Sequence, residues 1–476
     1  MNKSIYEMTD SEIEILISSN LSINENKKKK NGEVFTPYSL INEMCDKLPS
    51  EVWSNPNYKW LDPCCGTGHF FMVIYKRLFD GLKDVIQDDD ERRNHIINNM
   101  LYMIELDDEN YNTCVSHYGG NANIFCGSFL EDEWKKEWNI ERFDVIVGNP
   151  PYNEGGIRCQ TTDRIRKGVN GVSPCKARTI WTLFVENSLK HLNVNKYLCF
   201  LNPASWISLK SKTSKLLLSK QLEYIRFYNC VDALKIFKKS GEIPLTYYVL
   251  KNTNTKNETR IYDNCLKQFV KFNIYENNFI PTEVISIFIK IYEFTKLYGS
   301  LKSKVVNPSV LDNLSQTAKK GYKFPVVSVY KKNVRIQYSN KSNFVINKPK
   351  LVLTNSTMGY PILDEHGSLF NNGSDKYYIT SNNLKELKQI QNFLYTPLIL
   401  YLITITRARQ KFFNNKIFEI LPDITKFIET EDIDDNTILD IFNLNDNEKA
   451  SLQVYVSKGE GRLTNHQLHL LKTYNH

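Results

Sequence analysis

Short apolar runs alternate with longer segments of helical periodicity between residues 60 and 250. The apolar runs predict β-strands at residues 60–62, 101–106, 122–126, 143–148, 197–201 and 245–250. Between them, apolar residues recur every three or four positions, which predicts helices at residues 69–82, 107–117 and 177–192. Strands that alternate with helices in this way indicate an α/β fold with a doubly wound parallel sheet.

The pattern changes at residues 252–258, which are rich in Asn, Thr and Lys. We interpret this change as a domain boundary and predict one domain at residues 1–255 and a separate mixed α+β domain at residues 256–476. Residues 13–21 form an amphipathic pattern near the start of the chain, and the acidic stretch at residues 87–91 predicts a loop. The uncharged residues 389–406 have the length of a membrane span, but the polar residues and the proline among them favour a buried core helix.

Composition adds little except in the second domain. The 476 residues are 41% hydrophobic and 24% charged, which is ordinary for a soluble globular protein, and their net charge is +8. Residues 301–360 contain eleven lysines and arginines against the single acid Asp312, interleaved with Tyr and Phe. A solvated basic face is the common explanation of such a segment, and a nucleic-acid surface is the alternative that the upstream motifs favour.

The cysteines and the amino terminus predict a protein that keeps its thiols reduced in the cytoplasm, or in a viral or host compartment that contains DNA. Ten cysteines occur without paired CxxC spacing; Cys159 and Cys175 could form half of a metal site, but no second pair completes it. We therefore expect no metal. The first fourteen residues carry acids and lack the apolar core of a signal peptide, and residues 24–31 form a basic run that reads as a solvated linker or a phosphate contact.

The tetrapeptide Asn149-Pro150-Pro151-Tyr152 directly follows the predicted strand 143–148. Two prolines cannot continue a sheet ladder, so the strand ends there, at the carboxyl edge where open α/β sheets bind ligands. An amide side chain, backbone carbonyls and an aromatic ring can together hold a planar group that bears an exocyclic NH₂. An ordinary strand-to-loop turn is the alternative, and context has to decide between them.

Three further segments follow predicted strands. Asp62 to Gly68 opens the first helix with glycines that let backbone N–H groups approach a ligand, but it has neither the third glycine of a dinucleotide site nor the lysine of a P-loop. Glu105 stands where an acid can accept hydrogen bonds from both hydroxyls of a ribose, with a salt-bridged surface acid as the alternative. Gly127-Ser128-Phe129 follows the third strand and offers a ring to an adenine.

In this order the motifs resemble the N6-adenine DNA methyltransferases of the γ arrangement. The motifs are Gly32-Glu33-Val34-Phe35-Thr36-Pro37, then Asp62 to Gly68, Glu105, and Asn149 to Tyr152, followed by Phe200 to Ile207 and the run from Ile236-Phe237 to Leu250. The resemblance covers roughly residues 30–251 and is specific because six motifs occur in one order. It implies a Rossmann-like methyltransferase sheet followed by a DNA target-recognition domain.

The resemblance also implies S-adenosylmethionine as the cofactor and a role for each matching residue. Phe35, Thr36 and Pro37 would line its methionine end, with Asp62 near its amino group, and Gly66 and Gly68 would admit it. Glu105 would hold the ribose, and Phe129 would stack on the cofactor adenine. Ser128 stands where family members often carry Asp, and it would accept one hydrogen bond from the adenine amine.

For catalysis, the Asn149 side chain and the Pro150 carbonyl would accept the two N6 hydrogens of the target adenine, without a metal or a covalent intermediate. A base inside a duplex cannot reach such a pocket, so the adenine must be flipped out. Tyr152 would stack on one face of it, beside Pro151, and Phe237 would cover the other.

Double-stranded DNA is the expected partner, and a cognate restriction endonuclease acting separately is compatible with this. Residues 153–178, with six Arg or Lys against two acids, are predicted to be a loop that closes on the DNA backbone. Two alternatives stay open: RNA adenine methylation and the methylase part of a bifunctional restriction–modification protein. The intact motif Asn149 to Tyr152 disfavours a non-catalytic DNA-binding module. Glutamine methylation in release factors uses the same tetrapeptide but is disfavoured by the upstream motif and the basic carboxyl half.

Overall fold

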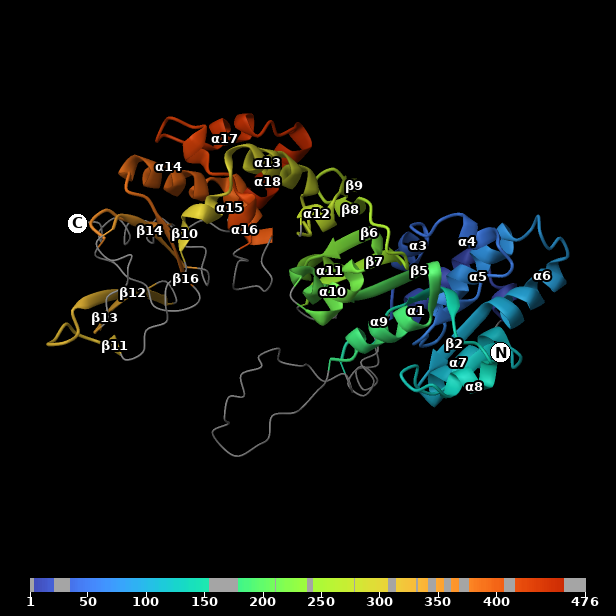
Figure 1. Cartoon of the computed structure of the whole chain (residues 1–476). Helices are drawn as coiled ribbons and strands as arrows, with labels where there is room; N and C mark the ends of the chain where they lie inside the picture. Colours follow the sequence, from blue (N-terminus) through green and yellow to red (C-terminus); the bar gives the residue numbers. More distant parts are fainter. Residues whose placement is uncertain are drawn as a thin grey trace. The chain divides into compact units, whose positions relative to one another are not determined.

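The computed structural model describes residues 4–20, 35–153, 179–209, 211–237, 243–277, 279–306, 314–330, 333–340, 348–354, 361–367, 376–405 and 416–457. The chain divides into two compact units. The first unit contains Met1–Tyr262 and Lys271–Ile280, and the second contains Asp263–Val270 and Pro281–His476. Figure 1 shows the elements of both units in the order of the chain. Of the predicted loop at residues 153–178, the structure describes Asn153, and the rest of the loop lies outside the described residues together with Cys159 and Cys175.

The first unit is built on a nine-stranded sheet with the order β3-β2-β1-β4-β5-β7-β6-β8-β9. Its strands are β1 (Trp60–Asp62), β2 (Leu101–Glu105), β3 (Asn123–Cys126), β4 (Phe143–Gly148), β5 (Leu192–Pro203), β6 (Gln221–Tyr228), β7 (Leu245–Lys251), β8 (Thr259–Asp263) and β9 (Gln268–Phe272). The strand order reverses between β1 and β4, which are parallel neighbours. This reversal is the topological switch point at which α/β sheets bind their ligands.

Helices connect these strands, as the alternating pattern predicts. They are α1 (Asp10–Asn20), α3 (Tyr38–Cys45), α4 (Glu51–Ser54), α5 (His69–Gly81), α6 (Asp89–His95), α7 (Asp108–Tyr118), α8 (Glu133–Trp138), α9 (Trp181–Lys190), α10 (Lys212–Leu218) and α11 (Cys230–Phe237). α5 packs against α1, α3 and α4. Eight of its thirteen residues are buried, and seven of these are consecutive, from His69 to Tyr75, which is the pattern of a helix that is covered on most sides.

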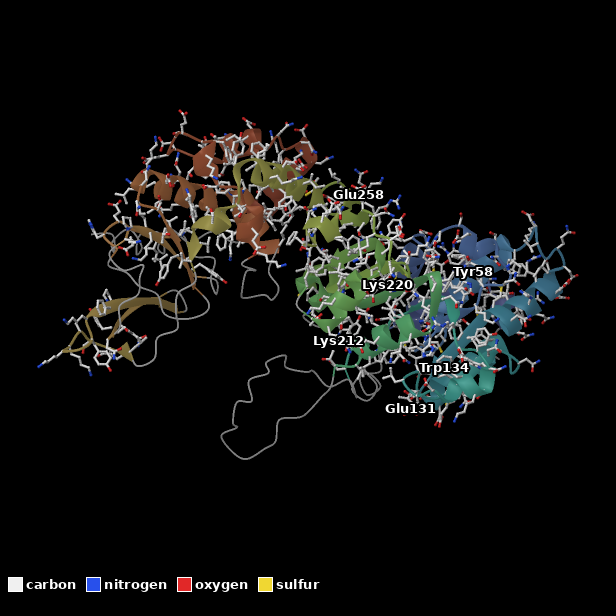
Figure 2. The ribbon with its side chains drawn as sticks, in the orientation of Figure 1. Tyr58, Glu131, Trp134, Lys212, Lys220 and Glu258 are labelled. Atoms are coloured by element: carbon white, nitrogen blue, oxygen red, sulfur yellow. The ribbon has the colours of Figure 1, made fainter. Side chains whose placement is uncertain are left out.

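Trp134 of α8, labelled in Figure 2, anchors an aromatic cluster in the first unit. Its ring centroid lies 5.9 Å from that of Phe129, 5.8 Å from that of Phe143 and 5.1 Å from that of His191. Its indole N–H donates to the Phe129 carbonyl over 3.3 Å, so the polar atom of the buried ring has a partner. Full burial of such large apolar side chains contributes on the order of 2–3 kcal/mol each.

The structure corrects the predicted elements at three places. The sheet is mixed, because β7 runs antiparallel to both β5 and β6. The strand predicted at residues 197–201 is part of the longer β5, and β6 was not predicted. The acidic residues 87–91 are not a loop throughout, because α6 begins at Asp89; the Asp88 carboxylate caps it by accepting a hydrogen bond from the Glu91 N–H over 2.7 Å.

The second unit is mixed α+β. One sheet has the order β10-β16-β14-β15 and another β11-β13-β12. Their strands are β10 (Val305–Val306), β11 (Leu314–Ser315), β12 (Phe324–Tyr330), β13 (Asn333–Ser339), β14 (Lys350–Thr354), β15 (Ile362–Asp364) and β16 (Lys376–Thr380). Its helices are α13 (Ile285–Tyr298), α14 (Leu384–Tyr395), α15 (Pro397–Ile405), α16 (Ile417–Ile420), α17 (Asp435–Ile441) and α18 (Asp446–Ser457), and the short α12 (Ile274–Asn277) belongs to the first unit.

The uncharged stretch at residues 389–406 is two helices rather than one. α14 ends at Tyr395 and α15 begins at Pro397, whose ring cannot continue the preceding helix. Gln389 is buried and donates to the Ile428 carbonyl over 2.7 Å. Within the described residues, no helix is long and apolar enough to cross a membrane.

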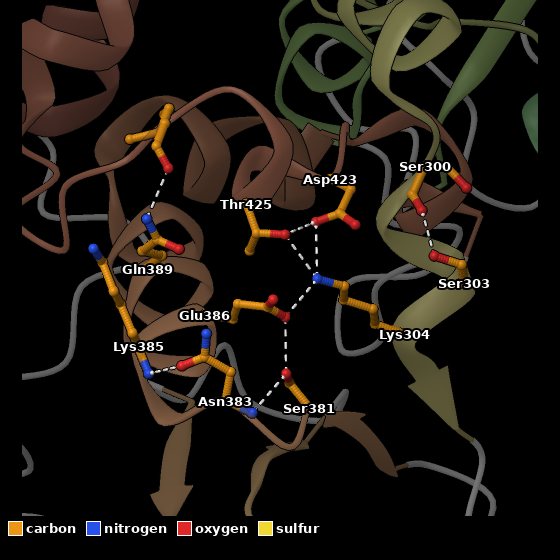
Figure 3. A network of polar contacts seen from close by, with 11 residues as sticks. Ser300, Ser303, Lys304, Ser381, Asn383, Lys385, Glu386, Gln389, Asp423 and Thr425 are labelled. Atoms are coloured by element: carbon orange, nitrogen blue, oxygen red, sulfur yellow. Dashed lines mark hydrogen bonds and ion pairs between the residues drawn. The ribbon is translucent and has the colours of Figure 1, made fainter.

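Among the described basic residues of the segment 301–360, Lys304 and Lys350 form ion pairs. Lys304 Nζ lies 3.0 Å from Glu386 Oε2 and 3.3 Å from Asp423 Oδ1, and Figure 3 shows this network with Thr425 and Ser381. Lys350 Nζ lies 2.6 Å from Asp364 Oδ2, and both side chains are buried. These two lysines hold the second unit together, whereas Lys319, Lys320, Lys323 and Lys348 are exposed.

Candidate active site

The loop from Asp62 to Gly68 joins β1 to α5 and is tied to the end of β2. The Cys65 N–H donates to the Ile104 carbonyl over 3.0 Å, and the Gly66 N–H donates to Glu105 Oε2 over 2.8 Å. Gly68 has φ +84°, and a Cβ there would stand 2.7 Å from the Tyr118 ring. The Tyr118 hydroxyl donates to the Gly68 carbonyl over 2.6 Å. Glycine is therefore required at position 68 both by the backbone conformation and by the close approach of α7.

Two carboxylates end the adjacent strands β1 and β2. Asp62 is 1% exposed, and its Oδ1 accepts a hydrogen bond from the Cys64 N–H over 3.1 Å. Burial raises the pKa of Asp62 to about 8; the Cys64 N–H opposes this rise, and the charge of Glu105 adds to it. The other oxygen of Glu105, Oε1, accepts from the Asp107 N–H over 2.9 Å. Glu105 is thus oriented by backbone donors on both sides.

Asn149 lies next to β1 and to the segment that precedes α3. Its Nδ2 donates to Thr36 Oγ1 over 3.2 Å, and Thr36 is 3% exposed. A Cβ on Gly148, the last residue of β4, would stand 2.9 Å from Asp62 Oδ1. The Asn149 N–H also faces the Cys64 thiol, whose pKa is raised mainly by burial. The structure therefore brings Thr36, Asp62 and Asn149 together at the switch point between β1 and β4.

The other residues of the tetrapeptide follow at the same edge. Pro150 is buried, and Pro151 and Tyr152 are partly exposed. The Tyr152 carbonyl accepts from the Ile180 N–H over 3.2 Å, and Asn153 pairs with Thr179 in an isolated antiparallel bridge. Burial raises the pKa of the Tyr152 phenol, and the Asn149 side chain partly opposes this rise. These contacts bring residues 153 and 179, which flank the predicted loop, together beside Tyr152.

Ser128 and Phe129 follow β3. Ser128 Oγ accepts a hydrogen bond from the Leu130 N–H over 3.2 Å. The Phe129 ring is 1% exposed and packs against Trp134 and against Phe184, whose centroid lies 5.7 Å away. In this structure the Phe129 ring is part of the aromatic core, and its stacking on a cofactor adenine stays a prediction.

The remaining predicted site residues Phe35, Pro37 and Phe237 belong to other elements. Pro37 caps α3, and its carbonyl accepts from the Leu40 and Ile41 N–H groups. The Phe35 ring centroid lies 4.9 Å from that of His69. Phe237 ends α11, which follows β6; β6 points the same way as β5 and β4, so α11 begins at the sheet edge that carries Asn149. The stacking role of Phe237 stays a prediction.

Sequence reasoning missed His69, Thr67 and Asn20. Thr67 Oγ1 lies 2.9 Å from His69 Nε2, and Asn20 Nδ2 lies 3.1 Å from the same nitrogen. A histidine directly after the glycine loop was the available signal, but the contact with Asn20 spans 49 residues and has no local pattern. Among the residues that the structure describes, no group of three or more His, Cys, Asp or Glu could hold a metal ion.

The chain resembles known methylases in sequence. Residues 70–237 match the Eco57I restriction-modification methylase family. The chain is 28% identical over 361 residues to an uncharacterized adenine-specific methylase of Mycoplasma pneumoniae, a match that covers 60% of this chain and 76% of that protein. It is 25% identical over 292 residues to the type II methyltransferase M.VspI of a Vibrio species, with coverages of 59% and 65%.

Among solved structures, the M protein of the type I restriction enzyme EcoKI aligns at 16% identity over 48% of each chain, with a TM-score of 0.35. The first unit has a mainly parallel sheet, with the glycine loop and the tetrapeptide at the switch point between β1 and β4. The sequence of this chain is thus similar to those of adenine-specific and type II modification methylases. It spans about two thirds of the M.VspI chain that it matches.

Proposed function

We propose that this protein is a site-specific DNA methyltransferase that transfers a methyl group from S-adenosylmethionine to N6 of an adenine flipped out of duplex DNA. The observation that supports this most is the place of Asn149. Its amide stands at the switch point of the sheet, bonded to Thr36 and next to the strand that carries Asp62. An amide acceptor beside a candidate cofactor site is what methyl transfer to an amino group requires.

Two features support S-adenosylmethionine as the cofactor. The backbone at Gly68 and Gly148 has no room for a side chain, and the carboxylates of Asp62 and Glu105, at the ends of β1 and β2, are oriented by backbone N–H groups. We assign Phe35, Thr36 and Pro37 to the methionine end of the cofactor, Asp62 to its amino group and Glu105 to its ribose. Gly66 and Gly68 admit it, and Ser128 and Phe129 border its adenine. When bound, the cofactor supplies a methyl group on a positively charged sulfur.

Asn149 is the central residue of the mechanism that we propose, because its amide oxygen accepts a hydrogen from the target amino group. The N6 lone pair of adenine is delocalised into the ring and is a weak nucleophile. Asn149 Oδ1 and the Pro150 carbonyl accept the two N6 hydrogens, which favours a tetrahedral nitrogen with a localised lone pair. Thr36 orients this amide, because it accepts from Nδ2 and so fixes which side of the amide carries the oxygen. The contribution is positioning together with fixed dipoles in a site shielded from water.

The target base is held by stacking in this proposal. Tyr152 and Phe237 cover its two faces, with Pro151 beside them, and each stacked aromatic contributes on the order of 1–3 kcal/mol. Extrusion of the base costs a few kcal/mol, which the stacking and the contacts of the DNA backbone offset. The second unit supplies target recognition, and its exposed lysines Lys319, Lys320, Lys323 and Lys348 contact the phosphates of the DNA.

The test uses purified protein, tritiated S-adenosylmethionine, duplex DNA of varied sequence and matched RNA, with nucleoside analysis of the product. The proposal expects label in N6-methyladenine from duplex DNA at a defined sequence. Label in N6-methyladenine from RNA alone would replace DNA by RNA as the substrate. Label in 5-methylcytosine, or only in protein, would overturn the proposed reaction.

A further inference from the structure

His69 is the first residue of α5 and directly follows Gly68 of the glycine loop. Its imidazole is 3% exposed. Nε2 lies 2.9 Å from the Thr67 hydroxyl and 3.1 Å from the Asn20 amide nitrogen. One face of the ring packs on Phe35, with an angle of 44° between the two ring planes.

These contacts come from three separate parts of the chain. Asn20 is the last residue of α1, Thr67 belongs to the glycine loop, and Phe35 begins the segment that leads to Thr36 and α3. Thr36 in turn accepts from Asn149. The imidazole therefore links an amino-terminal helix, the glycine loop and the segment beside the catalytic amide.

The imidazole is neutral. Burial, helped by nearby His117, lowers the pKa of His69 to about 3. Because Nε2 faces the N–H of the Asn20 amide, it accepts that hydrogen bond, and the ring proton sits on Nδ1. Within the described residues, no hydrogen-bond acceptor is within reach of Nδ1, which is buried. The ring thus carries no charge, and its acceptor nitrogen Nε2 is engaged by Asn20 and Thr67.

We infer that His69 is a positioning residue that fixes the methionine end of the cofactor pocket by holding Phe35, Thr67 and Asn20 in one arrangement. This inference rests on the proposed function. Without the imidazole, Phe35 loses its packing partner and the Thr67 hydroxyl loses the acceptor that orients it. The pocket must then be ordered when the cofactor binds, and that ordering lowers affinity.

The test compares His69→Ala, His69→Gln and His69→Asn by calorimetric titration with S-adenosylhomocysteine. A glutamine amide reaches the position of Nε2, whereas an asparagine amide reaches only that of Nδ1. We expect affinity to fall about tenfold in His69→Ala and in His69→Asn, and to stay within about threefold of wild type in His69→Gln. At saturating cofactor, kcat and the affinity for duplex DNA should stay near the wild-type values, so the loss appears in the KM for the cofactor.

The control is His95→Ala, because the described hydrogen bonds of His95 are with the Pro56 carbonyl and with Asn99, neither of which belongs to the glycine loop. Thermal melting identifies any variant that does not fold. If His69→Ala does not fold, Asn20→Ala replaces it, and an affinity loss of about threefold is expected because one contact of the cluster is removed.

Three outcomes decide the matter. Wild-type protein that does not bind S-adenosylhomocysteine contradicts the proposed function itself. Wild-type protein that binds it while His69→Ala binds equally well overturns the positioning role alone. Recovery of affinity by asparagine rather than glutamine also overturns it, because Nδ1 would then contact the cofactor directly.

Discussion

The proposed role of Asn149 depends on its side chain having both a donor group, Nδ2, and an acceptor, Oδ1. Nδ2 donates to Thr36 Oγ1, so Oδ1 lies on the opposite side of the carboxamide. An aspartate has no donor for Thr36 and carries a charge that would have to be desolvated, and an alanine has neither group. The chemistry at this position is therefore that of a neutral acceptor held at a fixed angle.

We expect Asn149→Ala to lower kcat by at least about 100-fold, because one of two fixed acceptors for the N6 hydrogens is lost. Binding of S-adenosylhomocysteine should be retained, and calorimetry together with single-turnover methylation of duplex DNA measures both quantities. Turnover near the wild-type rate would contradict the role of Asn149, whereas loss of both binding and turnover would point to a structural effect.

Asp62 predicts a pH dependence of cofactor binding. Its pKa is raised to about 8 by burial, so the carboxyl group is protonated at neutral pH in the absence of a ligand. The cofactor's ammonium group favours the ionised form, so binding below pH 8 releases a proton. Affinity should then rise with pH between about 6 and 7.5, by up to roughly tenfold per unit.

Calorimetry in buffers of different ionisation enthalpy measures this proton release, and Asp62→Asn should abolish it. The raised pKa of Asp62 also makes the stability of the fold depend on pH. The unfolded chain loses this proton near pH 4 and the folded one only near pH 8, so the contribution of Asp62 to stability falls as pH rises between these values. A cofactor titration at pH 6.5 without proton release would contradict the assignment of Asp62 to the amino group.

At the scale of elements, the sequence predicted the strands that carry the site and their connecting helices. β1, β2, β3 and β4 were predicted within one residue, because each is a short apolar run that ends at a polar or glycine residue. The direction of β7 could not be predicted, since hydrophobic pattern does not distinguish a parallel from an antiparallel neighbour. β6 was missed because Glu223 and Arg226 interrupt its apolar residues.

The same reasoning explains what was predicted of the candidate site. Asp62, Glu105 and Asn149 follow strands, so their meeting at one sheet edge follows from topology. His69 and Asn20 meet only because α1 packs on α5, a contact that no local pattern encodes. The buried position of Phe129 depends on Trp134 of α8, which follows directly in the chain, and on Phe184 of α9, which is 55 positions away and which no local pattern indicates.

The glycine loop gives a prediction at this scale. In Gly68→Ala, the alanine has to adopt the left-handed backbone of Gly68, and its Cβ would lie 2.7 Å from the buried Tyr118 ring. We expect it to lower the free energy of unfolding by about 1–3 kcal/mol and to weaken binding of S-adenosylhomocysteine. Urea unfolding and calorimetry measure the two effects.

Gly120→Ala is the matched control, because a Cβ at Gly120 meets nothing within 4 Å. Its free energy of unfolding should stay within about 0.5 kcal/mol of wild type. Equal stability of the two variants would show that Tyr118 and the backbone at position 68 adapt without cost.

At the scale of the whole molecule, the described lysines of residues 301–360 include two groups. Lys304 and Lys350 are engaged in ion pairs within the unit, whereas Lys319, Lys320 and Lys323 are exposed. Net charge alone does not distinguish these groups. The structure predicts that only the exposed group contributes to DNA binding.

Replacing Lys319, Lys320 and Lys323 by glutamine should weaken binding to duplex DNA and reduce the slope of log affinity against log salt by up to about 2.7, since each phosphate contact contributes about 0.9. Fluorescence anisotropy at several salt concentrations measures the slope. An unchanged slope in the triple variant would exclude this surface from DNA binding.

Lys350→Met should instead leave the buried Asp364 carboxylate without the ammonium group of Lys350 and lower the free energy of unfolding by about 3–5 kcal/mol.

The route of the chain between the two units has an evolutionary consequence. Residues Asp263–Val270 belong to the second unit, and the chain returns to the first unit for Lys271–Ile280 before entering the second again. In the returning segment, the Tyr275 hydroxyl accepts from the Leu222 N–H over 2.7 Å and donates to the Lys220 carbonyl over 2.8 Å. A single recombination event near residue 255 would separate β8 and Tyr275 from the sheet that they complete. Exchange of sequence specificity between relatives by shuffling is therefore expected to use breakpoints after residue 280.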